Sequence, residues 1–121
     1  MDLRAEVTQG LRDQGALFAY VFGSVARGEA RTDSDLDVAA LFPEPCPQSF
    51  DVEVPSGVDL LVLNSAPLEI KGKIALDGVL LFEDDAVARV RWESTTRKIY
   101  LDERYRIERS HREFLETMNS G

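Results

Sequence analysis

The sequence contains a single cysteine, Cys46, and a single histidine, His111. A lone cysteine forms no internal disulfide, and these two residues supply neither a Cys/His zinc site nor a Ser-His-Asp triad. No apolar run is long enough to cross a bilayer, and the N-terminal segment 1–6 is charged where a secretion signal would be apolar. We therefore expect a cytoplasmic protein that makes no contact with membranes.

Positive charge is also scarce. The chain has 14 basic and 22 acidic residues, a formal net charge of −8. A small acidic chain lacks the clustered Lys and Arg that bind nucleic-acid phosphates, so direct nucleic-acid binding is not expected. The acidic excess lies in residues 1–88, whereas the Arg-rich residues 89–121 carry a slight positive excess. The asymmetry is either solvated surface, or a sign that acidic residues hold metal and that the basic end meets an acidic partner.

A chain of 121 residues is long enough for one domain with a modest core and too short for two ordinary domains. We expect an α/β (α+β) architecture, a small sheet with helices packed on it. Residues 1–121 form a single domain in this prediction, with a core at 1–84 and a C-terminal helical segment at 85–121.

Strands are predicted from short apolar runs, at 17–22, 36–42, 57–63 and 79–82. The alternating residues 50–54 predict an edge strand or a hairpin arm. Helices are predicted from apolar spacing and from boundary residues, at 3 to about 15, at 24–28 and at 66–77.

The last quarter of the chain has neither Gly nor Pro between Asp84 and the terminal Gly121. This absence predicts a long helix from about residue 86, capped by Asp84 or Asp85, with Asp102 as a candidate position for a break. Its predicted partial apolar face consists of Val87, Val90, Leu101 and Tyr105.

The most informative pattern is Gly23-Ser24, then ten residues, then Asp35-Leu36-Asp37. Gly23 follows one predicted strand, and because it has no Cβ a phosphate can approach its backbone closely. If a helix begins at this point, its free N–H groups and the Ser24 hydroxyl favour an anion. Arg27 is either a solvated loop residue or a phosphate contact, and the same two interpretations hold for Arg31.

Asp35 and Asp37 open the second predicted strand, so their side chains point to the same face. Two neighbouring carboxylates repel each other unless a cation lies between them, and oxygen-only ligands suit Mg²⁺. Asp59 interrupts the apolar strand 57–63 and can join them if the two strands are neighbours. Three carboxylates can hold two metal ions for in-line displacement at phosphorus, whereas the alternative for Asp59 is a strand-end residue that faces water.

Two better-known phosphate loops are excluded by the residues themselves. Gly23 and Gly28 have the outer spacing of a Walker A motif, but Glu29 and Ala30 follow where that motif requires Lys and Ser or Thr. The segment also lacks the Gly-x-Gly-x-x-Gly pattern of a dinucleotide loop.

The Gly-Ser and Asp-x-Asp pattern, with Asp59 downstream, resembles the polymerase-β-like nucleotidyltransferase superfamily. Nearly the whole chain is similar to its minimal members of the MntA antitoxin type. The subgroup resemblance rests on the length and on three further segments, 58–67, 78–83 and Arg97-Lys98-Ile99-Tyr100.

This resemblance implies a short mixed sheet flanked by helices and a Mg²⁺-dependent transfer of a nucleoside monophosphate from a nucleoside triphosphate, with ATP as the expected donor. It implies that Gly23 and Ser24 bind the triphosphate, that Asp35 and Asp37 are metal ligands, and that Asp59 is the third carboxylate, which helps to activate the attacking hydroxyl.

The resemblance further implies that the acceptor is a tyrosine of a HEPN-domain RNase toxin of the HepT type, which attachment of AMP silences, and that the two proteins form a hetero-oligomer. The chain has Val25 where many relatives carry a basic residue after Gly-Ser, and Arg27 is the candidate substitute for that phosphate contact. Two other functions remain open at this point. One is an antitoxin that acts by contact alone with a relict nucleotide site, and the other is a small-molecule (antibiotic) nucleotidyltransferase.

Overall fold

Four strands and three α-helices make up the part of the chain that the computed structural model describes, residues 2–23 and 35–120. The strands are β1 (Phe18–Phe22), β2 (Leu36–Leu41), β3 (Val58–Val62) and β4 (Val79–Glu83), and the helices are α1 (Leu3–Asp13), α3 (Leu68–Asp77) and α4 (Ala86–Ser120). Two short 3-10 turns, η1 (Ser49–Asp51) and η2 (Leu63–Ser65), complete these elements. The predicted strands 17–22, 36–42, 57–63 and 79–82 are confirmed.

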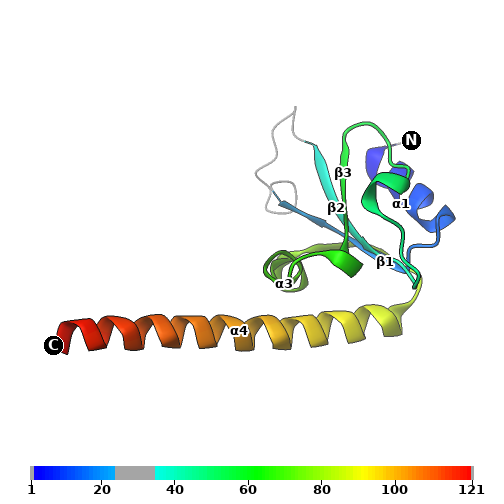
Figure 1. Cartoon of the computed structure of the whole chain (residues 1–121). Coiled ribbons are helices and arrows are strands. Elements are labelled where there is room, and N and C mark those ends of the chain that lie inside the picture. Colours follow the sequence, from blue (N-terminus) through cyan, green and yellow to red (C-terminus); the bar gives the residue numbers. More distant parts are fainter. Residues whose placement is uncertain (1, 24–34, 121) are drawn as a thin grey trace.

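The strands form one sheet in the order β3-β2-β1-β4 (Figure 1). β1 pairs antiparallel with both β2 and β4, whereas β2 and β3 are parallel. The sheet is therefore mixed, as the family resemblance implied. Because β2 and β3 run in parallel, the residues that open both strands lie at the same edge of the sheet.

The two faces of the sheet bury different side chains, as expected from the alternation along each strand. On one face, Val21 and Val38 pack with Val7 and Leu11 of α1. On the opposite face, the residues packed together come from the strands, η2, α3 and α4, namely Phe18, Tyr20, Ala39, Leu63 and Ile74 with Ala88 and Trp92 against them. Asp37, one residue away from Val38, belongs to this second face.

Capping residues explain where α1 and α4 begin. Asp2 accepts a hydrogen bond from the backbone N–H of Ala5, and Asp85 accepts one from Ala88, each at 2.9 Å. Asp85 is thus the cap predicted for the long helix. α1 ends before Gly15, whose φ of +92° favours glycine.

α4 is a single helix of 35 residues, and its C-terminal half extends beyond the sheet and α3 (Figure 1). The predicted break near Asp102 is wrong, since one Asp costs a helix less than about 1 kcal/mol and no Gly or Pro adds to that cost. No helix in the described part of the chain combines the length and the apolar character needed to span a membrane.

The predicted apolar face of α4 is also wrong. Val87, Val90, Leu101 and Tyr105 are all exposed. The helix packs instead through a mixed face that includes the buried Thr96, because polar side chains of this face find partners on the sheet and on α3.

An ion-pair network fixes α4 to the sheet. Glu93 accepts a hydrogen bond from the Tyr20 hydroxyl at 2.6 Å and pairs with Arg89 and Arg97, and Arg89 also pairs with Glu83 at the end of β4. Burial opposes ionisation of Glu93, but the hydrogen bonds from Tyr20 and Arg89 and the charges of Arg97 and Arg89 outweigh it and lower its pKa. Burial, together with the hydrogen bond to Glu93, raises the pKa of Tyr20.

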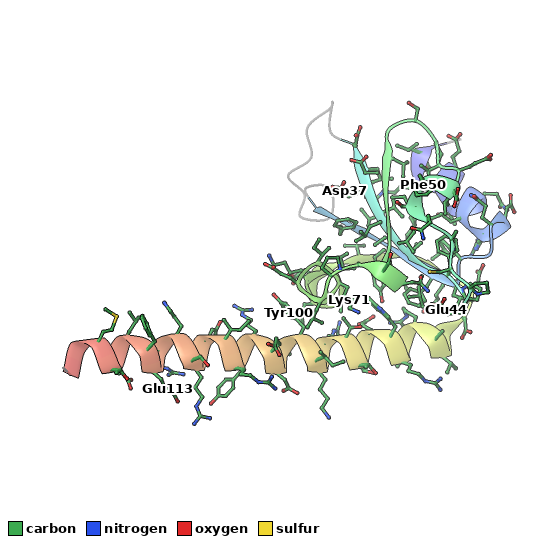
Figure 2. The ribbon with its side chains drawn as sticks, viewed as in Figure 1. Asp37, Glu44, Phe50, Lys71, Tyr100 and Glu113 are labelled. Atoms are coloured by element: carbon green, nitrogen blue, oxygen red, sulfur yellow. The ribbon has the colours of Figure 1, made fainter. Side chains whose placement is uncertain are left out.

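Helices α3 and α4 approach each other closely at Gly72. A Cβ on Gly72 would lie 2.2 Å from Cγ of Tyr100, so only glycine leaves space for that ring. Figure 2 shows Tyr100 directed from α4 toward α3. Arg97 adds a hydrogen bond to the carbonyl of Ala75, near the end of α3, at 2.7 Å.

The strand predicted at 50–54 is absent, and η1 stands at its start. The side chain of Gln14 hydrogen-bonds both the N–H and the carbonyl of Glu53, each at 2.8 Å, so this backbone is satisfied without a neighbouring strand. Val52 is buried, whereas Phe50 faces solvent. The alternating residues 50–54 thus lie in a loop that Gln14, directly after α1, holds by hydrogen bonds.

Candidate active site at the β2–β3 edge

Gly23 and Asp37 are in close contact at the ends of neighbouring strands. Gly23 directly follows β1, and its neighbour Phe22 pairs with Asp37 of β2. A Cβ at Gly23 would lie 2.3 Å from Oδ2 of Asp37, and the φ of this residue is +75°. Glycine is therefore needed here both for the backbone conformation and for the approach of the carboxylate.

Asp59 is the residue of β3 that lies opposite Asp37. The parallel register pairs Asp37 with Asp59, so both side chains are on the α3 side of the sheet. Asp35 stands directly before β2, two residues from Asp37, and is exposed. The sheet thus places the three predicted carboxylates at one edge, next to Gly23. Asp59 is exposed, so it avoids the cost that a buried unpaired carboxylate would carry.

The three carboxylates interact electrostatically at Asp37, which is half-buried and lies between the other two. Burial raises the pKa of Asp37, and the negative charges of Asp59 and Asp35 raise it further. Burial and neighbouring negative charge therefore both disfavour ionisation of Asp37, and a bound cation would favour it.

The donor chemistry of this edge fits Mg²⁺. Carboxylate oxygens on adjacent strands are the ligands that Mg²⁺ accepts, with water and substrate phosphate completing its shell. Within residues 2–23 and 35–120, however, no group of three or more His, Cys, Asp or Glu side chains is placed closely enough to enclose an ion. Of the three carboxylates, Asp37 has Gly23 on one side and Asp59 on the other. It is labelled beside the start of β2 in Figure 2.

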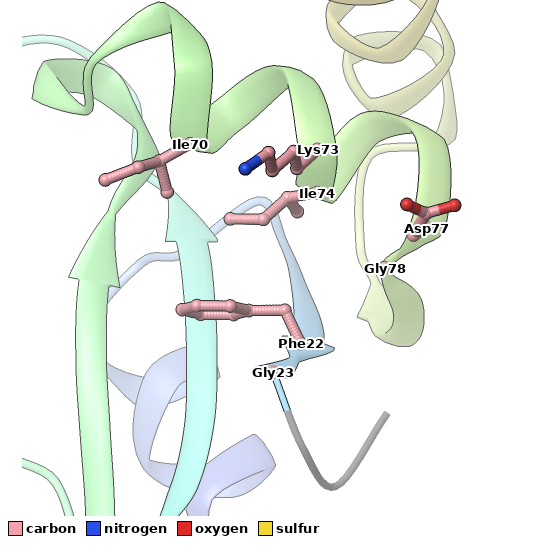
Figure 3. Close-up of a pocket in the computed structure, with 7 residues that line it drawn as sticks. All are labelled: Phe22, Gly23, Ile70, Lys73, Ile74, Asp77 and Gly78. Carbon is pink, nitrogen blue, oxygen red and sulfur yellow. The ribbon is translucent and has the colours of Figure 1, made fainter. Parts of the chain in front are cut away.

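A cavity of about 530 Å³ opens between the end of β1 and α3 (Figure 3). Its walls combine apolar side chains with a few polar ones, and the residues that line it are Phe22, Gly23, Ile70, Lys73, Ile74, Asp77 and Gly78. Gly23 thus belongs both to this cavity and to the carboxylate edge.

The sequence patterns did not single out most of these lining residues. Ile70, Lys73 and Asp77 lie in a predicted helix whose orientation the sequence alone does not define, and Phe22 was interpreted only as a strand residue. The sequence offered one signal: Phe22 directly precedes Gly23, the predicted phosphate-binding glycine, so its side chain could have been expected to border the same space.

Five other predictions concern residues outside this arrangement. Ser24, Arg27 and Arg31, with the short helix predicted at 24–28, lie outside the described residues. His111, the single histidine, is an exposed residue of α4.

The family model described as "Polymerase beta, Nucleotidyltransferase" matches residues 6–87. The match includes most of α1, the whole sheet, Gly23 and all three carboxylates. The chain therefore belongs to the polymerase β nucleotidyltransferase family.

Solved structures with the same fold come from toxin–antitoxin complexes. A chain of a mutant MntA–HepT toxin–antitoxin aligns with a TM-score of 0.71 at 17% identity, over 93% of this chain and 98% of that one. A chain of a toxin–antitoxin with AMP-PNP gives 0.65 at 22% identity, over 89% and 98%. A chain of the tri-AMPylated Shewanella oneidensis HEPN toxin in complex with MNT antitoxin gives 0.59 at 21%, over 89% and 95%. No protein of curated function matches the sequence.

Proposed function

We propose that this chain is an antitoxin that transfers AMP from ATP to a tyrosine of a cognate HEPN-domain toxin, using Mg²⁺. The observation that carries the proposal is the position of Asp37, which lies between Gly23 and Asp59 in a chain of the nucleotidyltransferase family. Catalysis best explains why a fold would gather three repelling carboxylates beside a glycine that leaves room for them.

Each residue at the edge has a role in this proposal. Asp35 and Asp37 hold the metal, with Asp59 as the third carboxylate, and Gly23 allows the triphosphate to approach the backbone. Mg²⁺ at this position would orient the α-phosphate and offset its charge, and two ions fit the number of carboxylates.

The reaction proceeds by in-line displacement. Asp59 accepts the proton of the tyrosine hydroxyl, whose oxygen forms a bond to the α-phosphorus. The bond from the α-phosphorus to the bridging oxygen breaks, and pyrophosphate leaves. Ser24 and Arg27 are proposed to contact the phosphates.

The structural neighbours support the proposed acceptor. The solved structures of similar fold include an AMPylated HEPN toxin in complex with MNT antitoxin. On this basis the proposed acceptor is a protein partner in a hetero-oligomer. The single cysteine is consistent with a cytoplasmic site of action.

The test combines the chain with ATP, Mg²⁺ and the HEPN protein encoded beside it, followed by mass spectrometry of the partner and an RNase assay. The wild-type chain should add AMP to a partner tyrosine and silence the RNase, and the Asp35→Ala, Asp37→Ala double variant should do neither. A double variant that still silences the RNase would show that the chain acts by contact alone. A partner that gains no AMP from the wild-type chain would refute the proposed transfer.

A further inference from the structure

The cavity between β1 and α3 has the dimensions and walls of a small-molecule site. Its volume of about 530 Å³ is within the usual range for ligand pockets, about 300–1,000 Å³. Phe22 contributes an aromatic ring, while Ile70 and Ile74 supply aliphatic wall from α3 (Figure 3). A flat ring system would bury apolar area between these groups.

Gly23 lies between the cavity and the carboxylate edge. This residue lines the cavity, and its α-carbon lies against the carboxylate of Asp37. Phe22 pairs with Asp37 across β1 and β2, so its ring is on the same face of the sheet as that carboxylate. A molecule whose phosphates lie at Asp37 can therefore extend past Gly23 into the cavity.

Lys73 is the one basic residue among the described side chains that line this cavity. Its ammonium group is 3.9 Å from Glu69, and both side chains are largely exposed, so that pair contributes little. Lys71, two residues earlier on α3, lines a different cavity with Trp92 and Arg91. The two lysines differ in position but share a helix and a charge.

We propose that this cavity binds the nucleoside of the nucleoside triphosphate and that Lys73 contacts its phosphates. The inference rests on the proposed function and adds the residues that recognise the donor. The apolar wall of Phe22 and Ile70 holds the base. The Lys73 ammonium offsets part of the negative charge of the triphosphate.

The test measures binding by calorimetry, with Mg²⁺ and α,β-methylene ATP, whose α-phosphate is not transferred. Lys73→Gln should weaken binding by about 10- to 100-fold, because a charged hydrogen bond is lost. Ile70→Trp should abolish binding, since the larger side chain fills the cavity. Ile70 is 41% exposed, so both variants should keep the wild-type melting temperature.

Matched controls lie on the same helix. Lys71→Gln and Glu69→Trp change the charge or add the same bulk outside the cavity, and both should bind within about twofold of wild type. Inorganic tripolyphosphate separates the two halves of the inference. Its binding should weaken in Lys73→Gln and be unchanged in Ile70→Trp.

Wild-type affinity for the analogue in both Lys73→Gln and Ile70→Trp would overturn the inference and leave the proposed function intact. Absence of binding by the wild-type chain would refute the proposed function itself. Equal weakening by the control variants would also overturn the inference, because it would show a general effect of altering α3.

Discussion

At the scale of single residues, Asp37 is the centre of the site. It is half-buried, and its carboxylate lies where a Cβ at position 23 would be. It also lies opposite Asp59 in the parallel register of β2 and β3. These contacts make its carboxylate the most constrained of the three, so substitutions at or next to it test the account most sharply.

Gly23→Ala should separate the two strand ends. The new Cβ would overlap Oδ2 of Asp37. The alanine would also have to adopt a positive φ, which costs about 1–3 kcal/mol. We expect AMP transfer to fall by about 100-fold or more, because the carboxylate must move. Urea denaturation and transfer rates provide the measurements.

Gly10→Ala is the matched control for that substitution. A Cβ at Gly10 of α1 would meet nothing within 4 Å, so this variant should retain activity and be as stable as wild type or more so. Equal losses in both variants would contradict the specific role assigned to Gly23.

Asp37→Asn should make the metal-free protein more stable. Because the folded pKa of Asp37 is raised, its ionised form is destabilising, and that cost grows as the pH rises through the unfolded and then the folded pKa. Without divalent cations at pH 7, the variant should melt at a higher temperature than wild type. Added Mg²⁺ should stabilise wild type and have little effect on the variant, and the reverse order would contradict the repulsion described here.

At the scale of elements, the ion-pair network determines how α4 is held against the sheet. Tyr20 of β1, Glu83 of β4 and three residues of α4 contribute to it. Position 93 links α4 directly to a central strand, so the docking of this helix should depend on its charge.

Glu93→Gln should reduce the free energy of unfolding by about 1–3 kcal/mol, since a largely buried carboxylate loses charged partners. The pKa of Glu93 is lowered in the folded state, so its contribution is present above the unfolded pKa. That contribution should begin to decline as the pH falls below the unfolded pKa of about 4.3 and should be lost as the pH falls through the lower folded pKa. Urea denaturation at several pH values should therefore show a difference from wild type that shrinks in acid.

The control for Glu93 is Glu108→Gln, which removes an exposed ion pair with Arg104 on the same helix. We expect a change of less than about 0.5 kcal/mol at every pH. A Glu93→Gln variant as stable as this control would show that α4 is held by apolar packing alone.

The elements could largely be predicted from the sequence because apolar runs and boundary residues are local signals. Segment 50–54 could not, since its backbone partner is the side chain of Gln14, which directly follows α1. The packing face of α4 could not either, because it is fixed by pairs such as Tyr20 with Glu93, which periodicity of apolar residues does not detect.

At the scale of the whole molecule, the acidic excess of residues 1–88 now has a partial structural basis in the carboxylate edge. The charges of the C-terminal half of α4 pair within the helix, as in Arg104 with Glu108 and Arg109 with Glu113. For these residues the structure favours a solvated helix face.

The site itself could be predicted only in part. The sequence predicted that Asp59 joins Asp37 only if their strands are neighbours, which the parallel register of β2 and β3 provides. The close approach of Gly23 to Asp37 was not predicted. The cavity depends on how α3 lies over β1, which is a tertiary feature, so Phe22, Ile70 and Lys73 could not be recognised beforehand. The metal and catalytic roles of the carboxylates stay predictions.

Removal of residues 109–121 should leave the rest of the molecule folded. In this segment Arg109 pairs with Glu113, and Thr117 donates to the Glu113 carbonyl, both within α4. We expect the melting temperature to change by less than about 4 °C and nucleotide affinity to be unchanged. A larger loss in either quantity would mean that the end of α4 supports the sheet.

The central claim is that the β2–β3 edge transfers the nucleoside monophosphate, and parallel assays with ATP labelled at the α- or the γ-phosphate test it most directly. With Mg²⁺ and the HEPN partner, the account predicts that α-label becomes covalently attached to the partner, that γ-label does not, and that Asp37→Asn abolishes the attachment. Attachment of γ-label, or undiminished attachment of α-label by Asp37→Asn, would contradict it.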